Sequence, residues 1–336
     1  MEFVLTHKVP TYSKAAMRQQ KRGNMKQVLL GNSGLTVSEM CMGVMNFGTS
    51  VDRETSFRLL DAFVDAGGTF IDTSNNYAHW LGTGDESETL LGEWFEKSGK
   101  RDKIVLATKV GFDRHGVGQG LKKHQIEYWC DESLRKMKTD VIDLYYAHVD
   151  DMDTPIEEYM EAFNSLIKKG KVRAIGGSNY YTWRLAEVKH TCEQNNLINY
   201  SVLQQRFTYL FAKGGIQRPY PFNENAGIEK LRYLAQNNMP LVAYSCMAAG
   251  GYADNSRLPE QYIQGERLET LNRMAAEKHI SPDSLVIAWM LHSQRFPNRP
   301  QIIPLFSSSK VEHLLHNVAA AEISLTNEEL NILNEA

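Results

Sequence analysis

From Val28 onward, short apolar or β-branched segments alternate with amphipathic segments along the chain. Eight segments are continuously apolar or β-branched, as strands buried on both faces are, and they lie at 37–43, 69–72, 104–109, 141–148, 174–178, 200–204, 241–244 and 302–305. Segments with helical periodicity lie between them, at 53–66, 87–97, 124–137, 155–169, 183–194, 227–237 and 267–279, and a further helix is predicted at 281–293. Strands that alternate with helices predict a parallel sheet.

The helix boundaries and the even composition favour one domain. Pro155 follows Thr154 at the start of one predicted helix, and Gly170 follows the two lysines that close it, which are common signals at helix ends. A length of 336 residues allows two domains or one large α/β barrel. No composition shift or low-complexity tract divides the chain after residue 25. The sequence therefore predicts a single-domain (β/α)8 TIM barrel over residues 25–336.

Residues 1–24 differ from the rest of the chain. The basic residues Lys8, Lys14, Arg18, Lys21 and Arg22 stand against the single acid Glu2. The segment has no apolar core long enough for a secretory signal and few of the serines typical of transit peptides. Met25 then opens a new pattern, so we expect residues 1–24 to form a flexible N-terminal extension.

Composition excludes several classes of function. Lys and Arg number 37 against 40 Asp and Glu, so the near-neutral chain gives no general attraction to nucleic acid or to anionic membranes. No apolar run approaches the ~18 residues that span a bilayer. The four cysteines, Cys41, Cys130, Cys192 and Cys246, have neither disulfide-rich nor zinc-site spacing. We therefore expect buried thiols, a reducing cytoplasmic location and no metal.

Chemically active side chains follow three successive predicted strands. Asp72 ends the second strand, Lys109 the third and His148 the fourth, while Tyr77 lies in the loop just after Asp72. In a barrel, the loops at the C-terminal strand ends build the active site. Each residue alone is commonly a cap or a solvated side chain. Their occurrence on neighbouring strands predicts that the four share one pocket.

Such a set suits the protonation of an oxygen that gains negative charge. Free tyrosine ionises near pH 10, which is high for proton exchange at neutral pH. A lysine ~4 Å from Tyr77 contributes about 4 kcal/mol at an effective dielectric of ~20, so we expect Lys109 to lower the pKa of Tyr77. Asp72 would hold the ammonium, and a neutral His148 would donate a hydrogen bond to substrate. This chemistry matches carbonyl reduction by hydride.

An ordered series of motifs resembles the aldo-keto reductase family, in particular its bacterial, potassium-channel-β-like branch, over residues 25–317. The matching stretches are LGNSGLTVS at 30–38, FIDTSNNY at 70–77, DESE at 85–88 with LG at 91–92, TK at 108–109, DLYYAH at 143–148 and GKVRAIGGSN at 170–179. The resemblance implies a (β/α)8 barrel that uses NADPH, less often NADH, without metal. It assigns the catalytic tetrad to Asp72, Tyr77, Lys109 and His148, with Tyr77 as the general acid.

The same resemblance implies the ligand contacts. Ser178, Asn179 and Gln204 match residues that bond the nicotinamide carboxamide, and Tyr244 matches the aromatic residue that stacks on the ring. The further expected cofactor contacts are Met45, Asp72, Ser245, Met247, Ser307, Ser309, Lys310, His313 and Asn317. The expected substrate pocket contains Phe47, Trp80 and His148, with Asn46, His79 and Tyr181 as further candidate walls. We expect three loops near the mouth of the barrel, at 82–84, 116–120 and 250–265. The glycines at 116–120 lack the G-x-G-x-x-G spacing of a classical dinucleotide-binding fold.

The chain departs from the family pattern at the adenosine-phosphate site. His313 stands where the family commonly has an arginine, and histidine and Lys310 would grip a 2′-phosphate less firmly than a bidentate arginine. NADP(H) is the favoured cofactor and NAD(H) the alternative. His313 and His316 have a spacing that could bind a metal, but no third ligand lies near them in the sequence.

These patterns predict an NAD(P)H-dependent oxidoreductase that reduces an aldehyde, ketone or sugar-like carbonyl to the alcohol. One alternative is a regulatory subunit that binds the nicotinamide cofactor with little turnover, because potassium-channel β subunits are similar barrels that serve mainly to bind a partner. Another is Schiff-base chemistry at Lys109. The expected partner is a small carbonyl substrate, with neither nucleic acid nor membrane, and the oligomeric state is left open.

Overall fold

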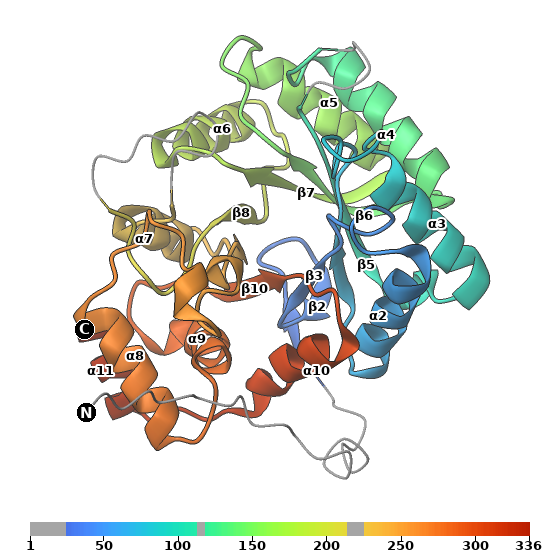
Figure 1. Ribbon diagram of the computed structural model, residues 1–336. Coiled ribbons are helices and arrows are strands. Elements are labelled where there is room, and N and C mark those ends of the chain that lie inside the picture. Colours follow the sequence, from blue (N-terminus) through green and yellow to red (C-terminus); the bar gives the residue numbers. More distant parts are fainter. Residues whose placement is uncertain (1–24, 113–117, 214–224) are drawn as a thin grey trace, which may run out of the picture.

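The computed structural model describes residues 25–112, 118–213 and 225–336, and its centre is a closed barrel of parallel strands (Figure 1). The strands follow one another around the barrel in the order β10-β3-β4-β5-β6-β7-β8-β9. Their bounds are β3 (Cys41–Gly43), β4 (Phe70–Asp72), β5 (Val105–Val110), β6 (Ile142–Ala147), β7 (Val172–Ser178), β8 (Leu203–Arg206), β9 (Leu241–Tyr244) and β10 (Ile302–Phe306). Pairing of Leu305 with Cys41 closes the ring between the last strand and the first. The predicted (β/α)8 barrel is confirmed.

Helices surround this barrel on the outside (Figure 1). Their bounds are α2 (Arg53–Asp65), α3 (Glu86–Ser98), α4 (Lys123–Met137), α5 (Ile156–Lys168), α6 (Thr182–Gln194), α7 (Ile228–Gln236), α8 (Glu266–Glu277), α9 (Pro282–Leu291), α10 (Val311–Ala319) and α11 (Asn327–Glu335). The additional helix predicted before the last strand is α9, capped by Ser281. The helix α11 is not among the predicted helices, although Thr326 and Glu329 form the capping box that marks its start.

The predicted first strand at 37–43 is wrong as a single element. Residues Thr36–Ser38 form β2, which pairs antiparallel with β1 (Gln27–Leu29), and only β3 joins the barrel. The chain turns between β2 and β3 because the Ser38 hydroxyl donates to Met40 O at 2.7 Å and accepts from Thr69 N at 3.0 Å. These bonds hold the hairpin against the start of β4.

The hydrophobic core has two layers. The inner layer fills the barrel and includes residues of the hairpin; its members are Leu30, Val37, Cys41, Phe70, Ala107, Leu144, Tyr146, Ala174, Val202, Val242 and Ile303. The outer layer lies between the strands and the helices and contains the larger share of the buried side chains. Gly176 makes room for the inner layer, because a Cβ there would lie 2.7 Å from the Tyr146 ring. Leu30 and Val37 place the hairpin at the N-terminal end of the barrel, opposite the predicted site.

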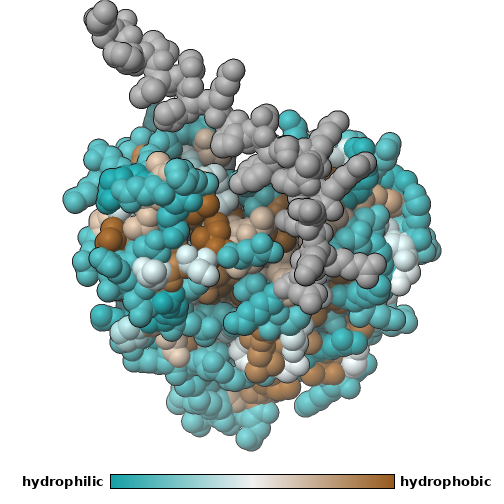
Figure 2. Space-filling model, turned by 90° about the horizontal axis from the view of Figure 1, so that it is seen from below, coloured by the Kyte–Doolittle hydropathy of each residue, from teal (hydrophilic) through white to brown (hydrophobic). Residues whose placement is uncertain are grey.

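The cysteines agree with the expectation from the sequence, and the surface is mixed in polarity. Figure 2 shows one face on which hydrophobic side chains form separate areas between hydrophilic ones. Within the described ranges, no helix is long and apolar enough to cross a membrane. All four cysteines are buried free thiols.

Candidate active site

The C-terminal ends of β4, β5 and β6 bring the four predicted side chains together. Lys109 Nζ lies 2.5 Å from Asp72 Oδ1 and donates to Tyr77 Oη at 2.6 Å. The Tyr77 hydroxyl in turn donates to Asp72 Oδ1 at 3.2 Å. The His148 and Tyr77 rings meet edge to face, with centroids 5.8 Å apart. We call these three strand ends and their four side chains the tetrad arc.

Lys109 is held in the tetrad arc by three hydrogen bonds. Besides Asp72 and Tyr77, its ammonium donates to Thr73 O at 2.6 Å, so each of its N–H groups has a partner. The side chains of Lys109 and Asp72 are both fully buried. Burial lowers the pKa of Lys109, while the charge of Asp72 acts in the opposite direction. The buried cation is therefore paired and fixed in position, as a charge in a low-dielectric site must be.

The expectation that Lys109 lowers the pKa of Tyr77 is wrong. Burial, followed by the charge and hydrogen bond of Asp72, raises the pKa of Tyr77 well above its ordinary value of 10.0. The sequence shows only that the Lys109 ammonium would attract a Tyr77 phenolate. The opposing effects depend on tertiary contacts. Tyr77 consequently keeps its proton throughout the neutral range, which is the state that a proton donor requires.

His148 is positioned by its backbone and its ring together. Its N–H donates to Val110 O at 2.7 Å, and its carbonyl accepts from Asn179 Nδ2 at 3.0 Å. The ring Nδ1 lies 3.1 Å from the Ser74 hydroxyl. Burial and then the positive charge of Lys109 lower the pKa of His148 well below 6.5, so its imidazole is neutral at pH 7. Sequence reasoning did not select Ser74, whose only signal was its place between Asp72 and Tyr77.

The residues expected around a nicotinamide carboxamide also meet. Asn179 Nδ2 donates to Ser178 Oγ at 3.1 Å, and the Tyr244 hydroxyl donates to Asn179 Oδ1 at 2.7 Å. Gln204 Nε2 donates to Asp72 Oδ2 at 2.8 Å, which joins this group to the tetrad arc across the barrel. Asn179 has a φ of 61°, a left-handed conformation that asparagine adopts more readily than most residues.

The other expected cofactor contacts extend around the remaining strand ends. Ser245 and Met247 follow β9, Met45 follows β3, and 307–310 joins β10 to α10. Ser307, Ser309, Lys310 and His313 are exposed, whereas Asn317 is buried. In barrel order, β7, β8, β9, β10 and β3 are consecutive. We call their C-terminal ends the rim arc, and together with the tetrad arc they complete the ring.

The candidate substrate walls differ in accessibility. Trp80 is 57% exposed and lies edge to face with His79, with ring centroids 5.1 Å apart. Phe47 is fully buried in the outer core, so its expected place in the pocket has no support from this structure. Tyr181 is stacked against Trp183 at the start of α6.

The expected mouth loops are described in part. Tyr252 is buried in the loop at 250–265, and its hydroxyl bonds Thr208 Oγ at 2.7 Å and accepts from Leu210 N at 3.0 Å, so it packs into the body of the protein. Within 116–120, Gly120 N donates to Gly111 O at 2.9 Å. Residues 113–117 and 214–224 lie outside the described residues, as does the predicted extension at 1–24.

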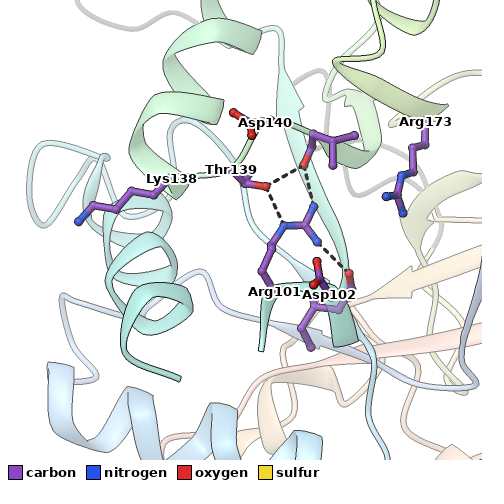
Figure 3. A pocket seen from close by; sticks show the side chains of 8 residues that line it. Arg101, Asp102, Lys138, Thr139, Asp140 and Arg173 are labelled. Atoms are coloured by element: carbon purple, nitrogen blue, oxygen red, sulfur yellow. Dashed lines mark hydrogen bonds between the residues drawn. The ribbon is translucent and has the colours of Figure 1, made fainter. Parts of the chain in front are cut away.

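A hollow of about 570 Å³ lies at the other end of the barrel, near the start of β5, β6 and β7 (Figure 3). Arg101 donates there to Ile104 O at 2.9 Å, Val141 O at 2.7 Å and Asp143 Oδ2 at 2.9 Å. Asp143 also pairs with Arg173 at 2.8 Å. The guanidinium groups of Arg101 and Arg173 are thus both paired with Asp143, which is typical of residues that stabilise the barrel.

The histidines of α10 have separate surroundings. His316 Nε2 lies 2.8 Å from Ser281 Oγ and 3.6 Å from Asp283 Oδ2, so its ring joins α10 to the start of α9. The nearby carboxylate of Asp283 raises the pKa of His316. Among the described residues, no group of three or more His, Cys, Asp or Glu side chains could hold a metal ion.

Comparison with known proteins decides the family. The model of the aldo/keto reductase family matches residues 39–336. The chain belongs to the aldo/keto reductase family. This aldo/keto reductase is 32% identical to an uncharacterized oxidoreductase, YrpG, of Bacillus subtilis, over 93% of this chain and 95% of that protein.

Two further relatives have more specific names. A norsolorinic acid reductase of Aspergillus flavus is 30% identical over 92% of this chain and 80% of its own length. An aryl-alcohol dehydrogenase of Phanerodontia chrysosporium, named for NADP(+), is 29% identical over 94% of this chain and 86% of its own length. Membership of this family supports an oxidoreductase that handles carbonyl compounds with a nicotinamide cofactor.

Proposed function

We propose that this aldo/keto reductase reduces an aldehyde, a ketone or a sugar-like carbonyl to the alcohol, with Tyr77 as the proton donor. The observation that carries the proposal is the triangle of Asp72, Tyr77 and Lys109, in which the buried Lys109 ammonium donates to the Tyr77 oxygen at 2.6 Å. A bound nicotinamide cofactor supplies the hydride that reaches the carbonyl carbon.

The chain's own residues handle the proton. As the carbonyl oxygen gains negative charge, Tyr77 gives it the phenolic proton and becomes a phenolate. Lys109 stabilises that phenolate through its existing bond, and Asp72 holds Lys109 in place. Tyr77 then recovers a proton from solvent. Neutral His148, against the Tyr77 ring, orients the substrate oxygen. Such fixed groups contribute to catalysis because they need little reorganisation during the reaction.

The rim arc has the donor set that a nicotinamide cofactor needs. Amide and hydroxyl groups of Ser178, Asn179 and Gln204 suit a carboxamide, and Tyr244 offers a flat face. Ser307, Ser309, Lys310, His313 and Asn317 would take the adenosine phosphate. We propose NADP(H) over NAD(H), supported by the exposed Lys310 and by the relative named for NADP(+). Initial rates with both cofactors test this choice, and a tenfold preference for NADH would refute it.

An aryl carbonyl is the first substrate class to test. The exposed Trp80, in the same loop as Tyr77, offers a face for an aromatic ring, and a relative is named an aryl-alcohol dehydrogenase. A panel of aryl aldehydes, aliphatic aldehydes, ketones and keto-sugars followed by NADPH oxidation measures turnover. A tightly bound cofactor without turnover across this panel would favour the regulatory alternative.

The decisive variant is Tyr77→Phe. It removes only the hydroxyl, so we expect kcat to fall by about 10²–10⁴-fold, the range that general acid catalysis contributes. The Kd for NADPH should change less than about twofold, which fluorescence titration measures. Normal turnover in this variant would overturn the mechanism.

We also propose that the protein works in the cytoplasm, supported by its four buried free thiols. Residues 1–24 are proposed to be an extension that the barrel does not require. Met25 supports this boundary, because it already belongs to the outer core.

A further inference from the structure

Arg206 lies at the C-terminal end of β8, in the rim arc, and the sequence analysis did not select it. Side chains alternate between the two faces of a strand, so residues two positions apart point to the same face. Arg206 therefore points to the same side of β8 as Gln204, whose amide reaches Asp72. Its neighbour in register on β9 is Tyr244. The Arg206 guanidinium lies over the Tyr244 ring, 5.2 Å from the ring centroid. Arg206 is therefore part of the wall against which a ligand stacked on Tyr244 would lie.

The hydrogen bonds of Arg206 are incomplete. Nη1 makes a single long bond, 3.3 Å, to Ser245 Oγ, and the buried Nε has no hydrogen-bond partner. Across residues 25–112, 118–213 and 225–336, no carboxylate lies within ion-pair distance of its guanidinium. A buried N–H of a charged group without an acceptor is unfavourable, and native proteins rarely leave one.

Other arginines of the fold show what a structural role looks like. Arg184 Nε lies 3.1 Å from Asp150 Oδ2, and its Nη2 donates to Asp151 O at 3.1 Å. Arg101 likewise bonds Asp143 and two main-chain carbonyls. Both guanidinium groups are neutralised by an acid and join neighbouring segments. Arg206 has no acid partner among the described residues, and it reaches the neighbouring strand only through the long bond to Ser245 and its contact with the Tyr244 ring. Ion pairing of the described residues therefore does not account for its charge.

We propose that Arg206 is an oxyanion-binding residue of the rim arc. It would take a phosphate or carboxylate of a ligand seated against Tyr244, using Nε and an Nη group as a two-pronged donor. The oxyanion has two sources, which rest on the proposed function: a phosphate of the nicotinamide cofactor or a carboxylate of the carbonyl substrate. β8 lies across the barrel from β4, so this position is separate from the proton-donating tetrad arc.

Two measurements on the Arg206→Met variant, which form the two arms of the test, distinguish a cofactor phosphate from a substrate carboxylate. The first measures the Kd for NADPH by fluorescence titration, and a rise of at least tenfold assigns Arg206 to the cofactor phosphate. The second compares kcat/KM for 4-carboxybenzaldehyde with that for its methyl ester. A tenfold loss confined to the carboxylate, with the Kd for NADPH unchanged, assigns Arg206 to the substrate.

Two further variants make the result unambiguous. Arg206→Lys keeps the positive charge but loses the two-pronged guanidinium donor, so it should give an intermediate effect in the same measurement that Arg206→Met changes. It also tests the proposal if Arg206→Met does not fold. Arg58→Met is the matched control, because Arg58 is an exposed arginine on α2, whose closest carboxylate, on Glu54, lies 3.9 Å away. The proposal is overturned if both arms stay within twofold of the wild type in the Arg206 variants. Wild-type protein that binds NADPH but reduces no carbonyl would contradict the proposed function alone, because the first arm does not depend on turnover.

Discussion

The tetrad arc and the rim arc occupy the same end of one barrel, yet their polar groups are used differently. In the tetrad arc, Lys109 has three acceptors and both oxygens of Asp72 are bonded. In the rim arc, Lys310 is exposed and Arg206 keeps a buried Nε without a partner. The first arc is organised by its own bonds before any ligand arrives, whereas the second carries bonding capacity that a ligand can use.

The largest effect is expected from breaking the tetrad arc at Lys109. Lys109→Met should lower kcat at least 100-fold and reduce the free energy of unfolding by about 3–5 kcal/mol, because it leaves Asp72 buried without its cation. Urea unfolding and steady-state rates measure the two effects. Adding Asp72→Asn should restore part of the stability but none of the activity. If Lys109→Met alone were as stable as the wild type, the ion pair of Lys109 and Asp72 would not hold the tetrad arc together.

A smaller effect, of opposite sign at the two positions, is expected from His148 in the tetrad arc and from His316 on α10. The pKa of His148 is lowered in the folded state, so the unfolded chain binds the extra proton and stability falls as the pH drops below about 6.5. The pKa of His316 is raised, so its contribution is full below about 6.5 and is lost as the pH rises through the folded value.

The free energy of unfolding, measured from pH 5 to 8, separates the contributions of His148 and His316. His148→Gln should flatten the acid loss of stability, and His316→Gln should remove the contribution that favours low pH. Each slope is at most about 1.4 kcal/mol per pH unit for one proton. If both variants change the pH dependence of the free energy of unfolding in the same direction, the contrast between the buried neutral His148 and the acid-paired His316 is wrong.

Lys310→Met sharpens the contrast within the rim arc. We expect the Kd for NADPH to rise about tenfold, which corresponds to about 1.4 kcal/mol, because the contact that we propose between the exposed Lys310 ammonium and the 2′-phosphate is lost. The Kd for NADH, which has no 2′-phosphate, is the internal control and should stay within twofold. Equal weakening of both cofactors would place Lys310 elsewhere on the ligand.

The smallest effect is expected outside both arcs. Removal of residues 1–24, so that the chain starts at Met25, should leave kcat within twofold and the Tm within about 2 °C, because Met25 and the described residues after it already form the core. Rates and thermal unfolding of the shortened chain measure this. A drop of tenfold in kcat would assign the extension a part in the active protein.

Local patterns were sufficient for much of the fold and the tetrad arc. Asp72, Lys109 and His148 stand at the ends of apolar segments, and parallel strands necessarily bring such ends to one face. The boundary between β2 and β3 could not be predicted in this way, because Ser38 turns the chain through bonds to Thr69, which is distant in sequence. Arg206 gave no signal either, since an arginine at a strand end usually indicates a solvated side chain.

The sequence by itself determined the alternating strands and helices, the barrel and the identity of the four side chains at its mouth, because periodicity and strand ends are local properties. Tertiary structure decided the protonation of those side chains and the use of the remaining cations. Burial and the charge of Asp72 raise the pKa of Tyr77 although Lys109 lies beside it. Desolvation and pairing depend on which distant segments surround a group, and no stretch of sequence contains that information.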